Sequence, residues 1–133
     1  MTLVLVAAGR SISIVAENKF MKIIHKNQTE KFKNGDNCTA IEYPIGDKDI
    51  NGAIVELTGR YPTKGRVVNL DCKELAYIIK GSGKVVVEDE EINLEEGDLV
   101  LIEAGEKYFW DGNLTVFLPC VPAWNSEQYR EVE

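Results

Sequence analysis

Residues 73–110 read KELAYIIKGSGKVVVEDEEINLEEGDLVLIEAGEKYFW, and this stretch decides the fold. Its apolar residues fall in short alternating runs, such as ELAYIIK and DLVLI, which is the period-two pattern of strands with one buried face. The runs are separated by GSG, EDEE, EEGD and AGEK. Gly tolerates positive φ, and acidic residues can bond their own backbone, so these connectors suit tight turns. The stretch therefore predicts several short strands joined by tight turns.

The same pattern extends over most of the chain, and no run of a dozen residues carries a helical stripe. Strands are predicted over residues 38–45, 52–59, 65–70, 74–81, 83–89, 90–94, 98–104, 107–112 and 114–121, with a turn at DGN between the last two. Eight or more short strands at this spacing indicate a sandwich or a closed barrel. We expect an all-β fold.

Length, charge and cysteine content restrict the class of protein. A chain of 133 residues is long enough for one core and too short for two independent domains. The formal charge of −7 repels a phosphate backbone, so nucleic acid is not an expected partner. Cys38, Cys72 and Cys120 are widely spaced and odd in number, which indicates neither a disulfide framework nor a zinc knuckle. We therefore expect a cytoplasmic protein in which these three thiols are reduced and buried.

The two ends of the chain differ from its middle. An apolar run in residues 1–20 lacks a positive leader and is too short to span a membrane. These residues are either an added edge strand or a dispensable extension before Met21. We expect a strand or extension over 1–37, a barrel over 38–124 and a polar tail over 125–133. A short helix capped by Ser126 is compatible with that tail.

The quoted stretch resembles the cupin superfamily, whose members are double-stranded β-helix or jelly-roll barrels. A first cupin motif, G-x5-H-x-H-x3-4-E-x6-G, is similar to this chain at Glu74 and Gly81. A second motif, G-x5-P-x-G-x2-H-x3-N, matches in spacing from Gly97 through Gly105 to Tyr108. The resemblance covers about residues 38–124 and implies a cupin-type jelly-roll barrel.

The histidines of the two motifs have no counterpart in this chain. In one register the first pair falls on Val68 and Leu70, and in the other it falls on Asp71 and Lys73. Tyr108 stands at the histidine position of the second motif. Transition metals in such barrels need neutral imidazole ligands beside a carboxylate. We therefore expect no bound metal and no other cofactor.

His25 is the chain's single histidine, and it lies upstream of both motifs. A lone histidine without spaced partners lacks the constellation that metal chemistry needs. It is expected to be exposed to solvent.

Strand alternation indicates which side chains line the interior of the barrel. If Glu74 points inward, Ala76 and Ile78 do too, and Trp110 follows Tyr108. These five residues are the candidate ligand-binding residues, since a few polar groups against aromatic walls are typical of a small-molecule site. Two alternatives stay open: Glu74 could be a solvated carboxylate at a strand end, and the two aromatic residues could simply fill the core.

Three functions fit this reading. The first is a metal-free barrel that binds a small polar ligand of carbohydrate-like kind. The second is a metal-independent isomerase or epimerase in which Glu74 and Tyr108 exchange protons with the substrate. The third is a metal enzyme with unusual ligands, namely Glu74, Asp71, Cys72 and Glu103. The fold alone does not choose among them.

The chain is also expected to form a homodimer. Small cupins are often dimers, so the resemblance implies one. The apolar runs TLVLVAA and ISIVA within residues 1–20 favour association through an N-terminal strand. The alternatives are a strand folded back on its own barrel and, if Met21 is the functional start, a disordered extension.

Overall fold

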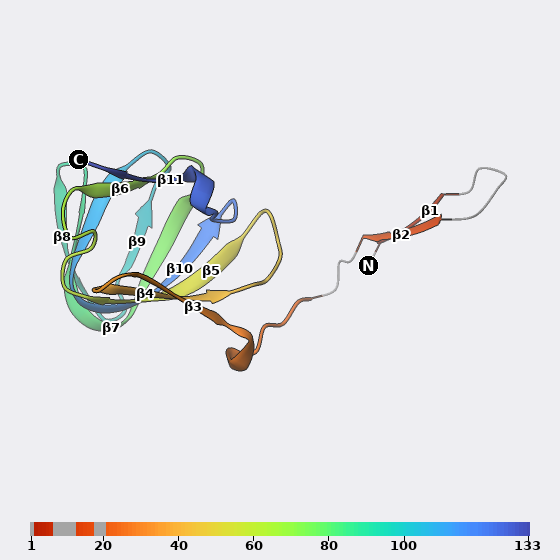
Figure 1. Cartoon of the computed structure of the whole chain (residues 1–133), viewed down its shortest axis with the longest axis horizontal. Helices are drawn as coiled ribbons and strands as arrows, with labels where there is room; N and C mark the ends of the chain where they lie inside the picture. The colour runs from red at the N-terminus through yellow and green to blue at the C-terminus, as the bar shows by residue number, and fades with distance from the viewer. Residues whose placement is uncertain (1, 7–12, 18–20) are drawn as a thin grey trace.

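The computed structural model describes residues 2–6, 13–17 and 21–133. Nearly all regular structure in these residues is strand, which confirms the all-β prediction (Figure 1). The strands are β1 (Thr2–Val6), β2 (Ser13–Glu17), β3 (Glu30–Gly35), β4 (Cys38–Tyr43), β5 (Asn51–Thr58), β6 (Arg66–Asn69), β7 (Lys73–Val87), β8 (Glu90–Glu95), β9 (Leu99–Ile102), β10 (Lys107–Val121) and β11 (Tyr129–Val132). Two single-turn 3-10 helices, η1 (Lys26–Gln28) and η2 (Ser126–Gln128), complete the described elements.

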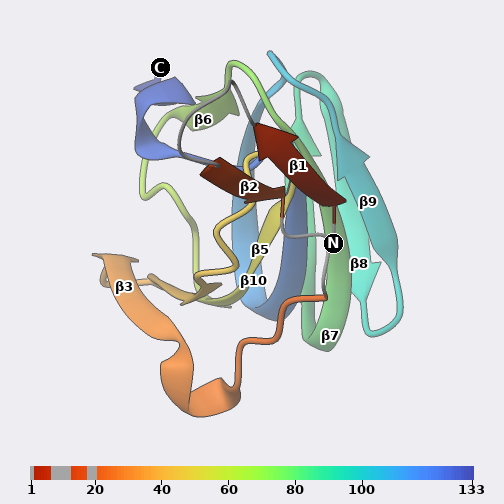
Figure 2. The same ribbon diagram turned by 90° about the vertical axis from the view of Figure 1, so that its right-hand side faces the viewer.

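Nine of the strands form one curled antiparallel sheet around a common interior (Figures 1 and 2). Along one path the strand order is β11-β6-β10-β5-β4-β3, and β7 joins this path through β10 while also pairing with β8 and β9. β7 and β10 have 15 residues each and pair along almost their whole length. These two strands connect the halves of the barrel.

The segments GSG and DGN, predicted as turns, lie inside β7 and β10 instead. Gly83 stands directly opposite Gly112, and a Cβ on Gly112 would lie 2.5 Å from the Gly83 Cα. Gly81 has a φ of +92°, a conformation that side chains rarely adopt. The glycines let two bending strands stay paired where larger residues would collide, so each pair of predicted strands is one continuous strand.

The interior of the barrel follows the predicted alternation. Along β7, Glu74, Ala76 and Ile78 are buried, while Leu75 and Tyr77 between them are exposed. The larger core contains these buried residues: Cys38, Leu57, Val67, Ala76, Ile78, Val85, Val87, Leu94, Val100, Ile102, Tyr108, Trp110, Leu114 and Val116. Burial of this apolar surface is the main term that stabilises the sheet in its curled form.

The paired strands of the barrel extend beyond its expected bounds, residues 38–124, at both ends. β3, within the expected extension, pairs with β4, and β11, within the expected tail, pairs with β6. η2 begins at Ser126, but its cap is Asn125, whose side chain accepts a hydrogen bond from the backbone of Glu127 at 3.0 Å. Beyond this single turn the chain continues as a strand.

β1 and β2 pair with each other as a separate two-stranded sheet. The added edge strand that the sequence suggested is therefore not found among the described residues, because β1 pairs with no strand of the barrel. Residues 1, 7–12 and 18–20 lie outside the described part of the chain, so the remaining expectations for residues 1–20 stay predictions. In the described residues, no helix has the length and apolar character needed to cross a membrane.

Gly81 and Gly97 provide a matched test of the close approach between β7 and β10. Their φ angles are +92° and +91°, but an added Cβ would lie 2.0 Å from the Asn113 carbonyl oxygen at Gly81 and would meet nothing within 4 Å at Gly97. Gly97→Ala should cost about 1–3 kcal/mol of unfolding free energy through backbone strain. Gly81→Ala should cost a further ~1–3 kcal/mol, because its added Cβ collides with the Asn113 carbonyl oxygen. Urea denaturation measures both, and equal costs would contradict this account of the paired strands.

Candidate functional site

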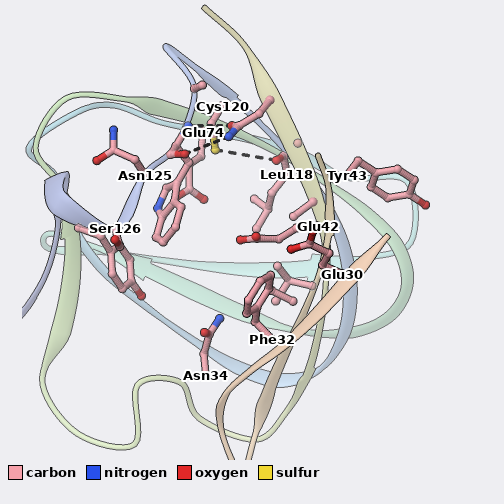
Figure 3. Close-up of a pocket in the computed structure, with 18 of the residues that line it drawn as sticks. Glu30, Phe32, Asn34, Glu42, Tyr43, Glu74, Leu118, Cys120, Asn125 and Ser126 are labelled. Carbon is pink, nitrogen blue, oxygen red and sulfur yellow. Dashed lines mark hydrogen bonds between the residues drawn. The ribbon is translucent and has the colours of Figure 1, made fainter. Parts of the chain in front are cut away.

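A cavity of about 770 Å³ opens into one end of the barrel. Its lining comes from β3, β4 and β5, the loop between β4 and β5, single residues of β6, β7 and β11, both ends of β10, and the segment that leads into η2. Figure 3 shows side chains from these separate parts of the chain around one common space. The volume lies within the range of ligand pockets in proteins, roughly 300–1,000 Å³.

Glu74 lies at the inner end of this cavity and is only 5% exposed. The Tyr108 hydroxyl donates a hydrogen bond to Glu74 Oε1 at 2.9 Å. The Asn69 amide Nδ2 donates to the same oxygen and also to the Tyr108 hydroxyl oxygen, the latter at 3.1 Å. One carboxylate oxygen is therefore held by two donors from two other strands.

Gln128 fixes the direction of these hydrogen bonds. Its Oε1 accepts from the backbone N–H groups of Asp71 and Cys72, at 3.1 and 3.2 Å, and a backbone N–H can only donate. The Nε2 of Gln128 must then donate to Asn69 Oδ1, 2.8 Å away. Asn69 consequently presents its Nδ2 group to Glu74 and Tyr108, and the hydroxyl proton of Tyr108 points to Glu74.

The other carboxylate oxygen of Glu74 has no partner among the described residues. Both hydrogen bonds to Glu74 end on Oε1. No fully enclosed side-chain oxygen or nitrogen in that part of the chain lacks a partner, so Oε2 is not enclosed. Because Glu74 lines the cavity, we infer that this free oxygen faces it. A carboxylate held on one side and open on the other is arranged to meet a hydrogen-bond donor.

Burial determines which protonation states the site can adopt. It raises the pKa of Glu74, and the hydrogen bonds from Tyr108 and Asn69 reduce that increase without cancelling it. The pKa of Tyr108 is raised well above its ordinary value, first by burial and then by the adjacent Glu74. Glu74 is therefore the member of the pair that can exchange a proton, while Tyr108 stays protonated.

Aromatic side chains form much of the wall. Trp110 packs edge-on against Tyr108 at 6.3 Å between ring centroids, and Trp124 packs edge-on against Tyr129 at 5.4 Å. The hydroxyl groups of Tyr61 and Tyr129 lie 3.2 Å apart. All five side chains line the cavity, so a ring-shaped ligand would meet aromatic surface on its way to Glu74.

Comparison with known proteins identifies the fold. Residues 59–117 match the profile of the EutQ-like cupin domain. These residues lie within the barrel, and the fold of the chain is that of the cupin β-barrels. No curated protein sequence matches it significantly.

Several solved cupin structures are similar to this chain at low sequence identity. A Streptomyces PAC13 variant with uridine has a TM-score of 0.77 at 18% identity, over 86% of this chain and 92% of that chain. KdgF from a Halomonas species has a TM-score of 0.63 at 12% identity, over 81% and 98%. The polyketide cyclase RemF from Streptomyces resistomycificus has a TM-score of 0.64 at 18% identity, over 86% and 87%. At such identities the likeness establishes the fold alone.

The candidate ligand-binding residues of this chain fall into two groups. Glu74, Tyr108 and Trp110 line the cavity as the alternation predicted. Ala76 and Ile78 do not, because β7 carries them away from the cavity into the apolar core, where both are 0% exposed. These two residues support the site through packing and are not placed to contact a ligand.

The residues suggested for an unusual metal site are not brought together. Asp71 and Glu103 are exposed, and Glu103 lies 3.8 Å from Lys73 in an ion pair, while Glu74 is enclosed. No group of three or more His, Cys, Asp or Glu side chains in residues 2–6, 13–17 and 21–133 is arranged to hold a metal ion. The donor set required for cupin metal chemistry does not fit the described residues.

Asn69 and Gln128 were not predicted from the sequence. Asn69 ends a β-branched run, VVN, where a buried amide is unusual, and this was a usable signal. Gln128 lies in a polar segment that resembles a solvated tail, yet it is only 3% exposed. No local pattern distinguishes it, because the four hydrogen-bond partners of its side chain come from elsewhere in the fold and from the turn before it.

The raised pKa of Glu74 predicts a pH-dependent effect of replacing it. Above the ordinary glutamate pKa of 4.5, the folded chain must hold a charge that burial disfavours, and this cost disappears as the pH falls and the carboxyl is protonated in both states. Glu74→Gln keeps an oxygen for Asn69 and Tyr108. Its unfolding free energy relative to the parent chain should therefore increase from about pH 4 to about pH 8. Urea denaturation across this range tests it, and a difference independent of pH would contradict the shift.

Proposed function

We propose that this cupin binds a small polar organic ligand, bearing hydroxyl groups on a ring as carbohydrates do, without the help of a metal ion. The observation that carries the proposal is the free Oε2 of a buried carboxylate at the inner end of an aromatic-walled cavity. A hydroxyl or N–H group of the ligand would donate to this oxygen. The network behind Oε1 keeps Glu74 in place and limits the entropy lost on binding.

The walls fit the rest of such a ligand. Sugar and nucleobase rings have apolar faces, and the rings of Trp110, Tyr61 and Trp124 offer surface against which those faces can pack. The PAC13 structure with uridine is consistent with a ligand of this size in a barrel of this shape. Only a few polar groups are needed to orient the ligand once it is enclosed.

A second candidate function is proton transfer, as in a metal-independent isomerase or epimerase. The raised pKa of Glu74 favours it, because an acid or base works best when its pKa approaches the working pH. In this reading Glu74 exchanges the proton through Oε2. Tyr108 positions the carboxylate and does not act as the second acid, since its proton already points to Glu74. PAC13 is described as a nucleoside dehydratase, which shows that a similar barrel supports catalysis.

The ligand-binding proposal is tested with a panel of monosaccharides, polyols and nucleosides, uridine included, by saturation-transfer NMR. At least one compound should bind, and Glu74→Gln should weaken it by about tenfold or more, since a hydrogen bond to a charged group contributes ~1.5–3 kcal/mol. Glu91→Gln is the matched control, because Glu91 is an exposed carboxylate of β8 that pairs with Lys84 at 2.9 Å outside the cavity. Equal affinities for both variants would contradict the site.

The same samples in D2O separate binding from proton transfer. An isomerase or epimerase should introduce deuterium at a carbon of the bound compound, and Glu74→Gln should abolish this exchange. A bound compound that keeps all its carbon-bound protons supports the binding function alone.

We also propose a cytoplasmic homodimer. Cys38, Cys72 and Cys120 are free thiols, which suits a reducing compartment. The outer face of β7 and β9 is apolar and open: Tyr77 is 45% and Leu99 59% exposed, and the two are cross-strand partners. A second copy that covers this face would bury it. Association through residues 1–20 is the alternative surface.

Light scattering should give the mass of two chains for the full-length protein. Leu99→Asp should shift the mass toward one chain if the outer face is the interface, and a chain starting at Met21 should do so if the N-terminal residues are. A monomeric parent chain would contradict the homodimer.

A further inference from the structure

The mouth of the cavity carries two carboxylates that face each other across neighbouring strands. Glu30 of β3 and Glu42 of β4 are cross-strand partners, and both line the cavity. Figure 3 shows them at the same edge of this space. Like charges directly opposite each other in a sheet destabilise it. A positively charged group in contact with both carboxylates at the mouth of the cavity would offset this repulsion.

No basic side chain in the described part of the chain supplies that contact. The ion pairs found there join Lys22 to Asp47, Lys73 to Glu103 and Lys84 to Glu91, and none includes Glu30 or Glu42. The lysines of β3, Lys31 and Lys33, alternate with the residues that line the cavity and so point to the other face of the strand.

All the charged side chains that line the cavity are acidic. Its described lining contains Glu30, Glu42, Asp47 and Glu74 but no Lys, Arg or His. Asp47 is partly neutralised by Lys22 at 4.0 Å and also accepts hydrogen bonds from the backbone of the loop that follows it. The uncompensated charge is therefore that of Glu30 and Glu42 at the mouth and of Glu74 inside.

A cavity with low-dielectric walls concentrates such a field and raises the local concentration of ions of opposite sign. Anionic ligands, such as sugar phosphates or uronates, would be repelled at the mouth and again at Glu74. Burial raises the pKa of Glu42, and the neighbouring charge of Glu30 raises it further. This direction agrees with the cross-strand pairing, which places the two carboxylates opposite each other.

We propose that the ligand is a cation: a small hydroxylated molecule whose ammonium group is held between Glu30 and Glu42 while its polar ring reaches Glu74 Oε2. This inference rests on the proposed binding function and deepens it by naming the class of ligand. The aromatic walls suit such a molecule as well, because their faces attract cations in addition to packing against rings.

The test uses matched triplets that share a ring and differ in one group: glucosamine, glucose and glucuronate, and benzylamine, benzyl alcohol and benzoate. Saturation-transfer NMR ranks the affinities within each triplet. In at least one triplet the amine should bind about tenfold more tightly than the alcohol, as expected for charge-assisted hydrogen bonds, and the carboxylate should bind weakest. Alcohols or carboxylates that bind as well as the amines would overturn the proposal.

Glu42→Gln identifies the residue responsible. This variant should lose most of the amine preference while keeping its affinity for the neutral member, and its stability should not fall, because the change removes a repulsion. Glu56→Gln is the control: Glu56 is an exposed carboxylate on the adjacent strand β5 and does not line the cavity. An unchanged amine preference in Glu42→Gln would also overturn the proposal.

The outcomes distinguish the cationic ligand from the proposed binding function on which it rests. Neutral compounds that bind through Glu74 with no amine preference would leave the proposed function in place and refute the cationic ligand. Absence of binding by every compound in the triplets and in the wider panel would refute both.

Discussion

Two hydrogen bonds to one oxygen of Glu74 are the interaction on which the site depends. A carboxylate inside a barrel is costly unless its charge is met by donors, and here Tyr108 and Asn69 meet it on one side only. Burial still raises the pKa of Glu74, so the compensation is incomplete. The other oxygen, Oε2, still lacks a hydrogen-bond donor, and we infer that it faces the cavity. Stability and ligand binding are thus linked at a single side chain, since a partner for this oxygen would relieve a cost already present in the empty barrel.

The rest of the fold can be understood as the support for this arrangement. Asn69 ends β6, Glu74 begins the inner face of β7, Tyr108 lies on β10 and Gln128 belongs to η2. The carbonyl of Asn69 accepts from Gly105 at 2.7 Å, and the backbone of Leu70 donates to Gln128 at 2.9 Å, so the ends of several segments are tied to one another. The long strands β7 and β10 hold these segments together, and their close glycine contacts allow the bend that places both strands around one cavity.

Sequence reasoning predicted what depends on local pattern. The period-two alternation placed Glu74, Tyr108 and Trp110 in the interior because successive strand residues point to opposite faces. It could not say how far along β7 the cavity extends, so it included Ala76 and Ile78, which belong to the core. GSG and DGN are sequences that suit a tight turn and equally suit a place where two strands approach closely. Only the tertiary contacts decide between the two, and here the glycines allow close strand contact.

The network behind Glu74 and the mouth of the cavity depend on contacts between residues distant in sequence. Gln128 reaches Asn69 across a separation of 59 residues, and no local pattern predicts that pairing. β3 lies within the predicted extension, residues 1–37, and its sequence EKFKNG has little apolar content, yet it supplies Glu30 to the cavity. Both features arise from how the sheet closes, which period and composition do not specify.

Titration of the Glu74 carboxyl carbon by ¹³C NMR shows directly whether this group is buried with one oxygen unsatisfied. We expect a midpoint above 4.5, the ordinary value for glutamate, because the side chain is buried and only one of its oxygens is satisfied by the protein. A midpoint at or below 4.5 would mean that the carboxylate is well solvated or fully paired. It would contradict both the free oxygen and the site built around it.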